Sequence, residues 1–161
     1  MNKKILIIAT MVLMLDQLLK IIIEASLLLN ESISIIKNFL AITYTNNYGG
    51  AWSILNNQMV LLIIAGLLGL FLIIYYMSTF KENFRNTIAF GLLLGGITGN
   101  LLDRLFLGYV RDFIAFTFGN YHFPVFNLSD IAICLGVGLL IYAIIRGEDN
   151  GNKCPSRTTK N

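Results

Sequence analysis

The chain has 161 residues, of which 56% are hydrophobic and only 13% are Asp, Glu, Lys or Arg. A soluble domain usually carries about 25% charged residues, and a chain this apolar could not cover its surface with polar groups in water. The bilayer is the solvent that suits it. The net charge of +3 comes without a dense basic patch, so we expect no nucleic acid partner.

The first apolar stretch covers residues 5–23 and contains Asp16 and Lys20. A helix needs about 20 mainly apolar residues to cross the hydrocarbon core, and this stretch is long enough. Lysines at positions 3 and 4 imitate the start of a secretory signal. Asp16 would end the apolar part of such a signal, however, and no small-residue cleavage site follows. We therefore expect an uncleaved first transmembrane helix.

Three further stretches predict membrane spans. Residues 59–77 contain no charge, residues 87–102 are rich in small residues, and residues 128–145 have Asp130 near their start. The small residues of the third stretch should allow close packing of helices: Gly91, Gly95, Gly96 and Gly99.

Lysine and arginine are shared unequally between the two sides of this four-span layout. One side carries eight, which are Lys3, Lys4, Lys81, Arg85, Arg146, Lys153, Arg157 and Lys160; the other carries four, which are Lys20, Lys37, Arg104 and Arg111. The excess of positive charge marks the cytoplasmic side, so both termini are predicted to be cytoplasmic. Residues 1–147 form one transmembrane domain in this interpretation, and the polar residues 148–161 form a flexible cytoplasmic tail.

Two connections then lie outside the cell. The longer one, residues 24–58, contains the stretch 39–45, whose β-branched and aromatic residues predict short strands. The shorter one, residues 108–126, is an aromatic loop that carries Asp112. The expected fold is an all-α membrane protein of four transmembrane helices with a small extracytoplasmic β-containing subdomain.

Polar side chains concentrate at the outer ends of the predicted spans. A charge near the bilayer centre costs about 2.5–3.5 kcal/mol on insertion scales, so residues of this kind are candidates for function. Separate segments bring polar groups to the same leaflet: Asp16, Lys20, Asn100, Asp103, Arg104, Asp112, Asn127 and Asp130.

Several of these side chains fit supporting roles. Asp16 and Lys20 are four residues apart on one helix face, so they should pair, with Lys20 extending outward to the membrane surface. Asp103 and Arg104 point in different directions and need partners elsewhere. Asn100 lies one turn before Arg104, within its reach.

Asp112 and Asp130 fit a catalytic pair. The intervening chain is long enough to fold back and bring the two carboxylates together, and close carboxylates at low dielectric tend to share a proton. The ionised member can then take a proton from water while the protonated member polarises a carbonyl. The alternative is that Asp112 is a solvated loop residue and that Asp130 caps the fourth helix beside Asn127 or Ser129.

Residues 47–52, Asn-Tyr-Gly-Gly-Ala-Trp, have two interpretations. They form either a tight turn with Trp52 at the membrane interface or a loop that passes against a substrate. Cys134, Cys154 and the single His122 do not make the pattern of a metal site, so no metal or cofactor is expected. Cys134 is interpreted as a small buried apolar residue and His122 as a loop residue.

Five short motifs occur in order along the chain, and together they resemble the motifs of lipoprotein signal peptidase, also called signal peptidase II. Residues 16–20 (D-Q-L-L-K) resemble D-Q-x-x-K, residues 47–52 resemble N-x-G-A-A-[FW], residues 99–104 (G-N-L-L-D-R) resemble G-N-x-x-D-R, residues 110–113 (V-R-D-F) resemble V-V-D-F, and residues 126–130 (F-N-L-S-D) resemble F-N-x-A-D.

The resemblance implies a membrane aspartyl peptidase that needs no metal. Members of this family remove the signal peptide of bacterial prolipoproteins that carry a diacylglyceryl group, and they cut just before the lipidated cysteine. The expected partners are therefore the prolipoprotein and membrane lipid. The expected location is the bacterial cell membrane, with the site at its outer face and the chain acting as a monomer.

The resemblance also assigns roles to residues. Asp112 and Asp130 would be the catalytic pair, and residues 24–58 would form a cradle and lid along the membrane. The other motif positions would bind substrate or support the pair: Asp16, Lys20, Asn47, Gly49, Asn100, Asp103, Arg104 and Asn127.

Three positions depart from the family motifs. Gly50 and Ser129 replace alanines, which changes little in size. Arg111 replaces an apolar residue directly before Asp112. We expect Arg111 to point to water or lipid headgroups; turned inward, it would lower the pKa of Asp112.

Two other classes of function compete with the peptidase. A transporter or channel would need polar groups that continue to the inner face, and the charge-free residues 59–77 argue against it. A non-enzymatic membrane scaffold would tolerate Asp112→Asn or Asp130→Asn, whereas a peptidase would not.

Overall fold

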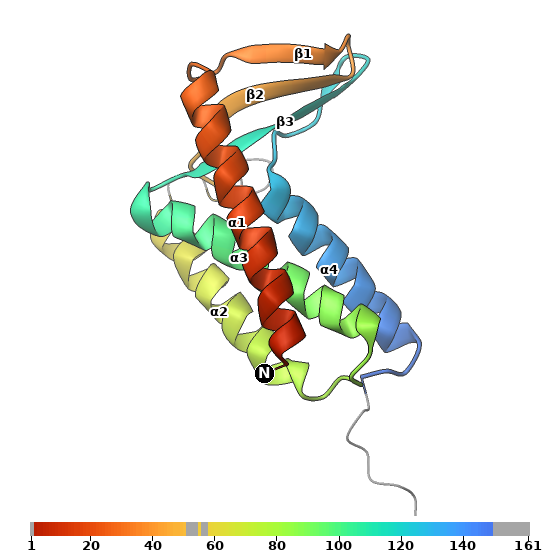
Figure 1. Cartoon of the computed structure of the whole chain (residues 1–161). Helices are drawn as coiled ribbons and strands as arrows, with labels where there is room; N and C mark the ends of the chain where they lie inside the picture. The colour runs from red at the N-terminus through yellow and green to blue at the C-terminus, as the bar shows by residue number, and fades with distance from the viewer. Residues whose placement is uncertain (1, 51–54, 56–57, 150–161) are drawn as a thin grey trace, which may run out of the picture.

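Four helices form a bundle with a small antiparallel sheet at one end, as the computed structural model shows for residues 2–50, 55 and 58–149 (Figure 1). The elements follow one another as α1 (Lys3–Ser26), β1 (Ser32–Ile36), β2 (Leu40–Asn47), α2 (Met59–Met77), α3 (Phe84–Phe106), β3 (Val110–Phe118), β4 (Tyr121–His122) and α4 (Leu128–Ile145). The N-terminus and the end of α4 lie at the end of the bundle away from the sheet (Figure 1). The expected fold class is confirmed.

All four helices are long and apolar enough to cross a membrane. The predicted spans 59–77 and 128–145 have the bounds of α2 and α4. The other two helices run a few residues further at each end than predicted. At the start of α3 the extension has a local cause, because the Asn83 side chain accepts a hydrogen bond from the backbone N–H of Asn86 at 2.8 Å and caps the helix there.

Helix α3 is the centre of the bundle, since it packs against α1, α2 and α4. Ala89, Phe90 and Leu93 of α3 are almost completely buried, whereas no residue of α2 is buried. The charge-free α2 therefore presents most of its surface outward, which suits lipid. The helix that carries the polar motif at residues 99–104 is held on three sides.

Glycines let α3 approach its neighbours closely, as predicted. A Cβ atom on Gly95 would lie 2.6 Å from the backbone oxygen of Ala9 in α1, and one on Gly96 would lie 2.6 Å from the backbone oxygen of Ser129 in α4. Such contacts are too short for any side chain, so the backbones meet only because glycine is present. This contact sets the spacing of three helices beneath the sheet.

The sheet has the strand order β1-β2-β3-β4 and is antiparallel throughout. The strand predicted at residues 39–45 is confirmed as β2. The second outer connection, expected to be an aromatic loop, is largely the strand β3, which pairs with β2 from Leu40↔Phe116 to Asn47↔Val110. The loop assignment was wrong because β3 is stabilised by β2, which is distant in sequence.

We expect Gly95→Ala to destabilise the bundle, because its new Cβ would force α1 and α3 apart. Overpacking of this kind costs about 1–3 kcal/mol. The measurement is thermal unfolding of the purified protein in detergent micelles. Gly138→Ala is the matched control, since a Cβ there has no neighbour within 4 Å. Equal unfolding temperatures for the two variants would contradict the packing argument.

Candidate active site

The first turn of α4 fixes the position of Asp130. The side-chain oxygen of Asn127 accepts a hydrogen bond from the backbone N–H of Asp130 at 3.0 Å, and Asp130 Oδ2 accepts one from the backbone N–H of Asn127 at 3.2 Å. These reciprocal bonds form a capping box. Asp130 therefore caps α4, as one interpretation of the sequence proposed. Its second oxygen, Oδ1, accepts a hydrogen bond from Asn100 Nδ2 at 2.7 Å.

Asp112 lies in β3 opposite Thr45 of β2 and is 2% exposed. Its Oδ1 accepts a hydrogen bond from Asn127 Nδ2 at 2.6 Å, and its Oδ2 accepts one from Asn47 Nδ2 at 2.9 Å. The alternative that Asp112 is a solvated loop residue is thus wrong. Two side-chain amides take the place of water around this carboxylate.

Two buried asparagines connect the carboxylates. Asn127 Nδ2 also donates to Asn100 Oδ1 at 3.0 Å, and Lys20 Nζ donates to the same oxygen at 3.1 Å. Because Asn100 Oδ1 accepts from two donors, its nitrogen must face Asp130, which fixes the orientation of the amide. Asp112 and Asp130, 18 positions apart in the sequence, are therefore both hydrogen-bonded to Asn127.

The surroundings of Asp112 favour its protonated form. Burial, followed by the negative charge of Asp130, raises the pKa of Asp112 from 3.8 to about 7. The hydrogen bonds from Asn47 and Asn127 and the positive charge of Lys20 act in the opposite direction but are weaker. At neutral pH the pair can consequently hold one proton, which is the state required for acid–base work by two carboxylates.

A buried ion cluster lies beneath the pair. Lys20 Nζ is 2.8 Å from Asp16 Oδ2 and 3.2 Å from Asp103 Oδ2, and the Lys20 side chain is fully buried. The predicted pair of Asp16 and Lys20 is confirmed, but Lys20 does not extend outward to the membrane surface. Its three donors meet three buried acceptors, including Asn100 Oδ1, and so it stays inside. Asp16 Oδ1 in turn accepts from the backbone N–H of Ser129 at 2.9 Å.

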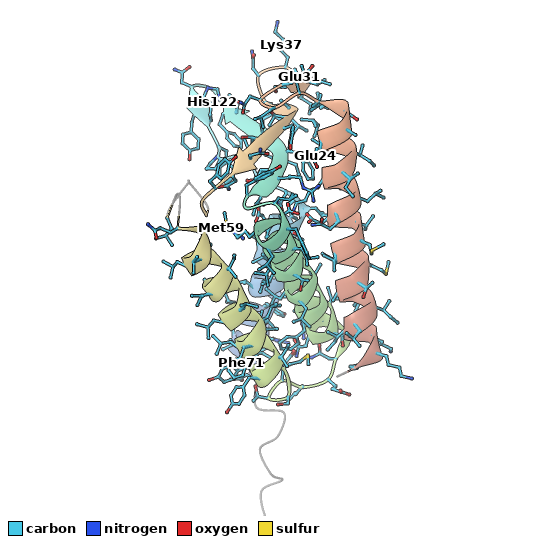
Figure 2. The ribbon with its side chains drawn as sticks, turned by 90° about the vertical axis from the view of Figure 1, so that its left-hand side faces the viewer. Glu24, Glu31, Lys37, Met59, Phe71 and His122 are labelled. Carbon is cyan, nitrogen blue, oxygen red and sulfur yellow. The ribbon has the colours of Figure 1, made fainter. Side chains whose placement is uncertain are left out.

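Arg111 was expected at the water or headgroup surface, and that expectation was wrong. The residue is 7% exposed and its guanidinium lies between α1 and α3. It contacts Asp103, Glu24 and Gln17. Glu24 lies where α1 meets the sheet (Figure 2). The inward position follows from these acceptors, which satisfy a charge that would be costly to bury alone.

Sequence reasoning did not assign roles to Gln17 and Glu24. Gln17 Nε2 donates to Asp103 Oδ1 at 3.1 Å, and Glu24 Oε2 binds Arg111 at 2.9 Å. A signal was present, because Gln17, Lys20 and Glu24 recur at the spacing of one face of α1. Both residues belong to the polar layer that joins α1 to α3 and β3.

Arg104 and Gly49 approach the same site from two sides. Arg104 Nη2 donates to the backbone oxygen of Gly49 at 3.1 Å and Nη1 to that of Asn100 at 3.5 Å. The backbone N–H of Gly49 donates to Asn47 Oδ1 at 2.9 Å. The expected reach between Arg104 and Asn100 is thus present, through the Asn100 backbone. All ten predicted site residues are joined in one network; Trp52 lies outside the described residues.

A groove of about 760 Å³ opens beside the carboxylates. Asp112, Asp130 and Arg104 line its polar part, and the apolar part includes Val110, Phe123, Phe126, Ile131 and Leu135. A cavity of similar volume, about 780 Å³, lies at the other end of the bundle, and among the described residues Glu82 is the only carboxylate that lines it. The carboxylate pair, not the volume, therefore identifies the candidate site.

Cys134 also lines the groove and is exposed, so its interpretation as a buried residue was wrong. The buried face of α4 is instead formed by smaller residues such as Ala132 and Gly136. His122 is exposed in β4, where its Nδ1 lies 3.2 Å from Thr117 Oγ1. Within the part of the chain that the structure describes, no three His, Cys, Asp or Glu side chains are grouped as metal ligands.

Comparison with known proteins gives consistent results. Residues 8–146 match the model of the family described as signal peptidase (SPase) II. The lipoprotein signal peptidase of Bacillus pumilus (strain SAFR-032) is 38% identical over 154 residues, which are 95% of this chain and 97% of that protein. The one from Halalkalibacterium halodurans is 37% identical over 148 residues, covering 91% and 95% respectively.

Solved structures agree with this similarity. A bacterial membrane enzyme solved by the in meso method at 2.3 Å resolution superimposes with a TM-score of 0.80 at 33% identity, covering 95% of this chain and 94% of that one. A second, at 1.9 Å resolution, gives a TM-score of 0.77 at 34% identity, covering 88% and 92%. The family model and the relatives both span most of the sequence, and the chain therefore belongs to the signal peptidase II family of membrane peptidases.

Proposed function

We propose that this protein is an aspartyl endopeptidase that removes the signal peptide from diacylglyceryl-modified prolipoproteins and cuts just before the lipidated cysteine. Membership of the signal peptidase II family supports signal peptide cleavage from prolipoproteins. The observation that carries the aspartyl mechanism is that both carboxylates are hydrogen-bonded to Asn127 at the wall of a groove, Asp112 to its side chain and Asp130 to its backbone N–H.

The two carboxylates have different surroundings, which suggests that they have different roles in acid–base catalysis. Asp112, with its raised pKa, holds the shared proton at neutral pH. Asp130 accepts the same number of hydrogen bonds, from the Asn127 backbone and from Asn100, but it is only partly buried, and a carboxylate with more access to water ionises more easily. In the proposed ground state, Asp130 is the base and Asp112 the acid.

The reaction then follows from these protonation states. Asp130 takes a proton from a water molecule whose oxygen attacks the carbonyl carbon, while the Asp112 proton moves to the carbonyl oxygen. The tetrahedral intermediate collapses when Asp112 takes that proton back and the carbon–nitrogen bond breaks. The proton held by Asp130 goes to the leaving amine, which restores both carboxylates and balances the addition of one water.

The groove suits a substrate that is both lipidic and peptidic. Its apolar lining can accept acyl chains or an apolar signal helix, while the scissile bond lies at its polar part. Asn47, Gly49 and Arg104 line or contact this polar part and are the proposed substrate contacts. Residues 24–58 would form the cradle and lid above it.

The proposed orientation places both termini in the cytoplasm and the site at the outer face of the cell membrane. Of the four cations assigned to the outer side, Lys20 and Arg111 are ion-paired and Arg104 is held by backbone oxygens. Lys37 alone among these four is an exposed charge. The proposal of cytoplasmic termini rests on the excess of lysine and arginine on the opposite side, eight against four.

The proposed functional unit is a monomer, in which all ten predicted site residues are joined within one chain. Residues 1–147 are the proposed peptidase domain. At its inner end the Glu148 carboxylate contacts Asn83 and Arg85, so the packed part of the chain includes Glu148. Most of the proposed flexible tail, residues 150–161, lies outside the described residues.

We expect the purified protein to cleave a diacylated lipobox peptide, and we expect Asp112→Asn and Asp130→Asn each to lower kcat by at least about a thousandfold while the protein still folds. Peptide cleavage and thermal unfolding in detergent are measured together. Glu82→Gln, an equal charge change at the opposite end of the bundle, is the control and should keep full activity. Wild-type cleavage rates in either Asp→Asn variant would favour a scaffold over an aspartyl peptidase.

The pH profile should fall on the alkaline side. As pH rises through about 7, Asp112 loses its proton and the pair becomes doubly ionised, so the acid is lost and kcat decreases. The profile of cleavage rate between about pH 6 and about pH 8 tests this sign. An increase in kcat over that range would contradict the assignment of Asp112 as the acid.

Lipid recognition makes a separate prediction. The same lipobox peptide without its diacylglyceryl group should be cut with a kcat/KM at least about tenfold lower, because remote apolar binding energy is lost. The two peptides are compared at equal detergent concentration. Equal kcat/KM values would show that the groove does not recognise the lipid.

A further inference from the structure

The Arg111 side chain makes four polar contacts in the layer next to the carboxylate pair. Its Nη2 is 2.8 Å from Asp103 Oδ1 and its Nε is 3.3 Å from Asp103 Oδ2, which gives a two-point contact. Its Nη1 donates to Glu24 Oε2 at 2.9 Å and its Nη2 to Gln17 Oε1 at 2.9 Å. A planar guanidinium held at several points has little freedom to move.

The backbone of Arg111 is held as well. Its N–H donates to Asp103 Oδ2 at 3.0 Å, and its carbonyl accepts from Asn127 Nδ2 at 3.4 Å. Asp103 thus binds both the main chain and the side chain of the same residue. This arrangement fixes β3 against α3 at the position directly before Asp112.

Strand geometry links this clamp to the site. Successive side chains of a strand point to opposite faces, so Arg111 faces α1 and α3 while Asp112 faces Asn47 and Asn127. A shift of β3 toward or away from the helices would move the Asp112 carboxylate relative to Asp130, which is fixed to α4 by its capping box. The Arg111 contacts resist that shift.

The clamp reaches the next strand through Glu24. While Glu24 Oε2 binds Arg111, its Oε1 accepts a hydrogen bond from the Tyr44 hydroxyl of β2 at 3.0 Å. Burial lowers the pKa of Arg111, but Asp103 and Glu24 raise it by more, so the guanidinium stays charged. One buried cation therefore ties α1, α3 and both central strands together.

Arg111 also shares the neutralisation of Asp103 with Lys20. Lys20 binds Asp16, Asp103 and Asn100, and Asn100 binds Asp130. Without Arg111, Lys20 alone would have to balance the two buried carboxylates, and any displacement of its ammonium would pass through Asn100 to Asp130. The removal of one guanidinium would thus disturb both members of the pair.

We propose that Arg111 is a positioning residue, which holds Asp112 at its working distance from Asp130 by clamping β3 to α1 and α3. It touches neither the groove lining nor the carboxylates of the pair by its side chain. This proposal rests on the proposed function, because it concerns the same pair. It assigns a role to the residue at which this chain departs from the apolar residue of the family motif.

Steady-state cleavage of the diacylated lipobox peptide by Arg111→Leu, Arg111→Lys and Glu24→Gln tests the proposal. Arg111→Leu should lower kcat by about 10- to 100-fold, the size of effect caused by displacing a catalytic group by about 1 Å. KM should change less than about threefold, since Arg111 does not contact substrate. Arg111→Lys should recover part of the loss, because an ammonium keeps the charge but cannot make the two-point contact.

Arg85→Leu is the matched control. Arg85, which is more exposed than Arg111, forms an ion pair with Glu148 at the other end of α3, so its loss removes an arginine ion pair without touching β3. Its kcat should equal that of the wild type even if its unfolding temperature falls. If Arg111→Leu does not fold, Arg111→Lys and Glu24→Gln test the positioning role in its place, and both variants should lower kcat with KM nearly unchanged.

Three results would overturn the positioning role. The first is a kcat within about twofold of wild type in all the Arg111 and Glu24 variants that fold. The second is a rise in KM with kcat unchanged in these variants. The third is a loss of kcat in Arg85→Leu as large as in the folded variants at positions 111 and 24. Failure of the proposed function gives a different result, since the wild type itself would then not cleave or Asp112→Asn would remain active.

Discussion

The site depends on one buried amide, the side chain of Asn127. Its oxygen caps α4 through the backbone of Asp130, and its nitrogen donates to Asp112 of β3 and to Asn100 of α3. A helix, a strand and the central helix of the bundle therefore meet at a group of three heavy atoms. An amide offers two N–H donors and an acceptor at fixed geometry, whereas an ionised carboxylate has no donor and a hydroxyl has only one, so neither could make this set of contacts. The relative position of the two acidic side chains is a consequence of that chemistry.

Much of the fold could be predicted from the sequence because membranes impose simple rules. Spans such as residues 59–77 follow from length and apolarity alone, and the close approach of α3 to its neighbours follows from its glycines. The polar residues that gather at one end could be found for the same reason, since the bilayer makes them costly elsewhere. What could not be predicted is which partner each one binds. Lys20 and Arg111 were placed at the surface because side-chain length favours it, and only the folded contacts with Asp103 reverse that preference. The strand β3 was missed because its stabilising partner, β2, is remote in sequence.

The position of the groove explains how a water-dependent reaction can be combined with an apolar substrate. The carboxylates lie beneath the sheet at one end of the bundle, while the apolar lining continues along α4 through Ile131 and Leu135. Lys20 and Arg111 pair with the buried Asp16 and Asp103 and with the more exposed Glu24, so the polar layer reaches into the bundle without a large net charge. The rest of the helices can then remain apolar toward lipid.

The capping box at α4 has a practical consequence for anyone who wishes to trap a bound substrate on an inactive enzyme. An acid-to-amide change at position 130 replaces one of two accepting oxygens with a donor, so either the bond from Asn100 or the bond from the Asn127 N–H at the helix start is lost. Loss of a capping interaction typically costs about 0.5–2 kcal/mol, so the change can alter the scaffold together with the chemistry. Position 112 lies in a strand that is held by its own ladder and by the contacts of its neighbour. For crystallisation or affinity measurements on a complex with uncleaved substrate, the substitution of Asp112 is therefore preferable to that of Asp130.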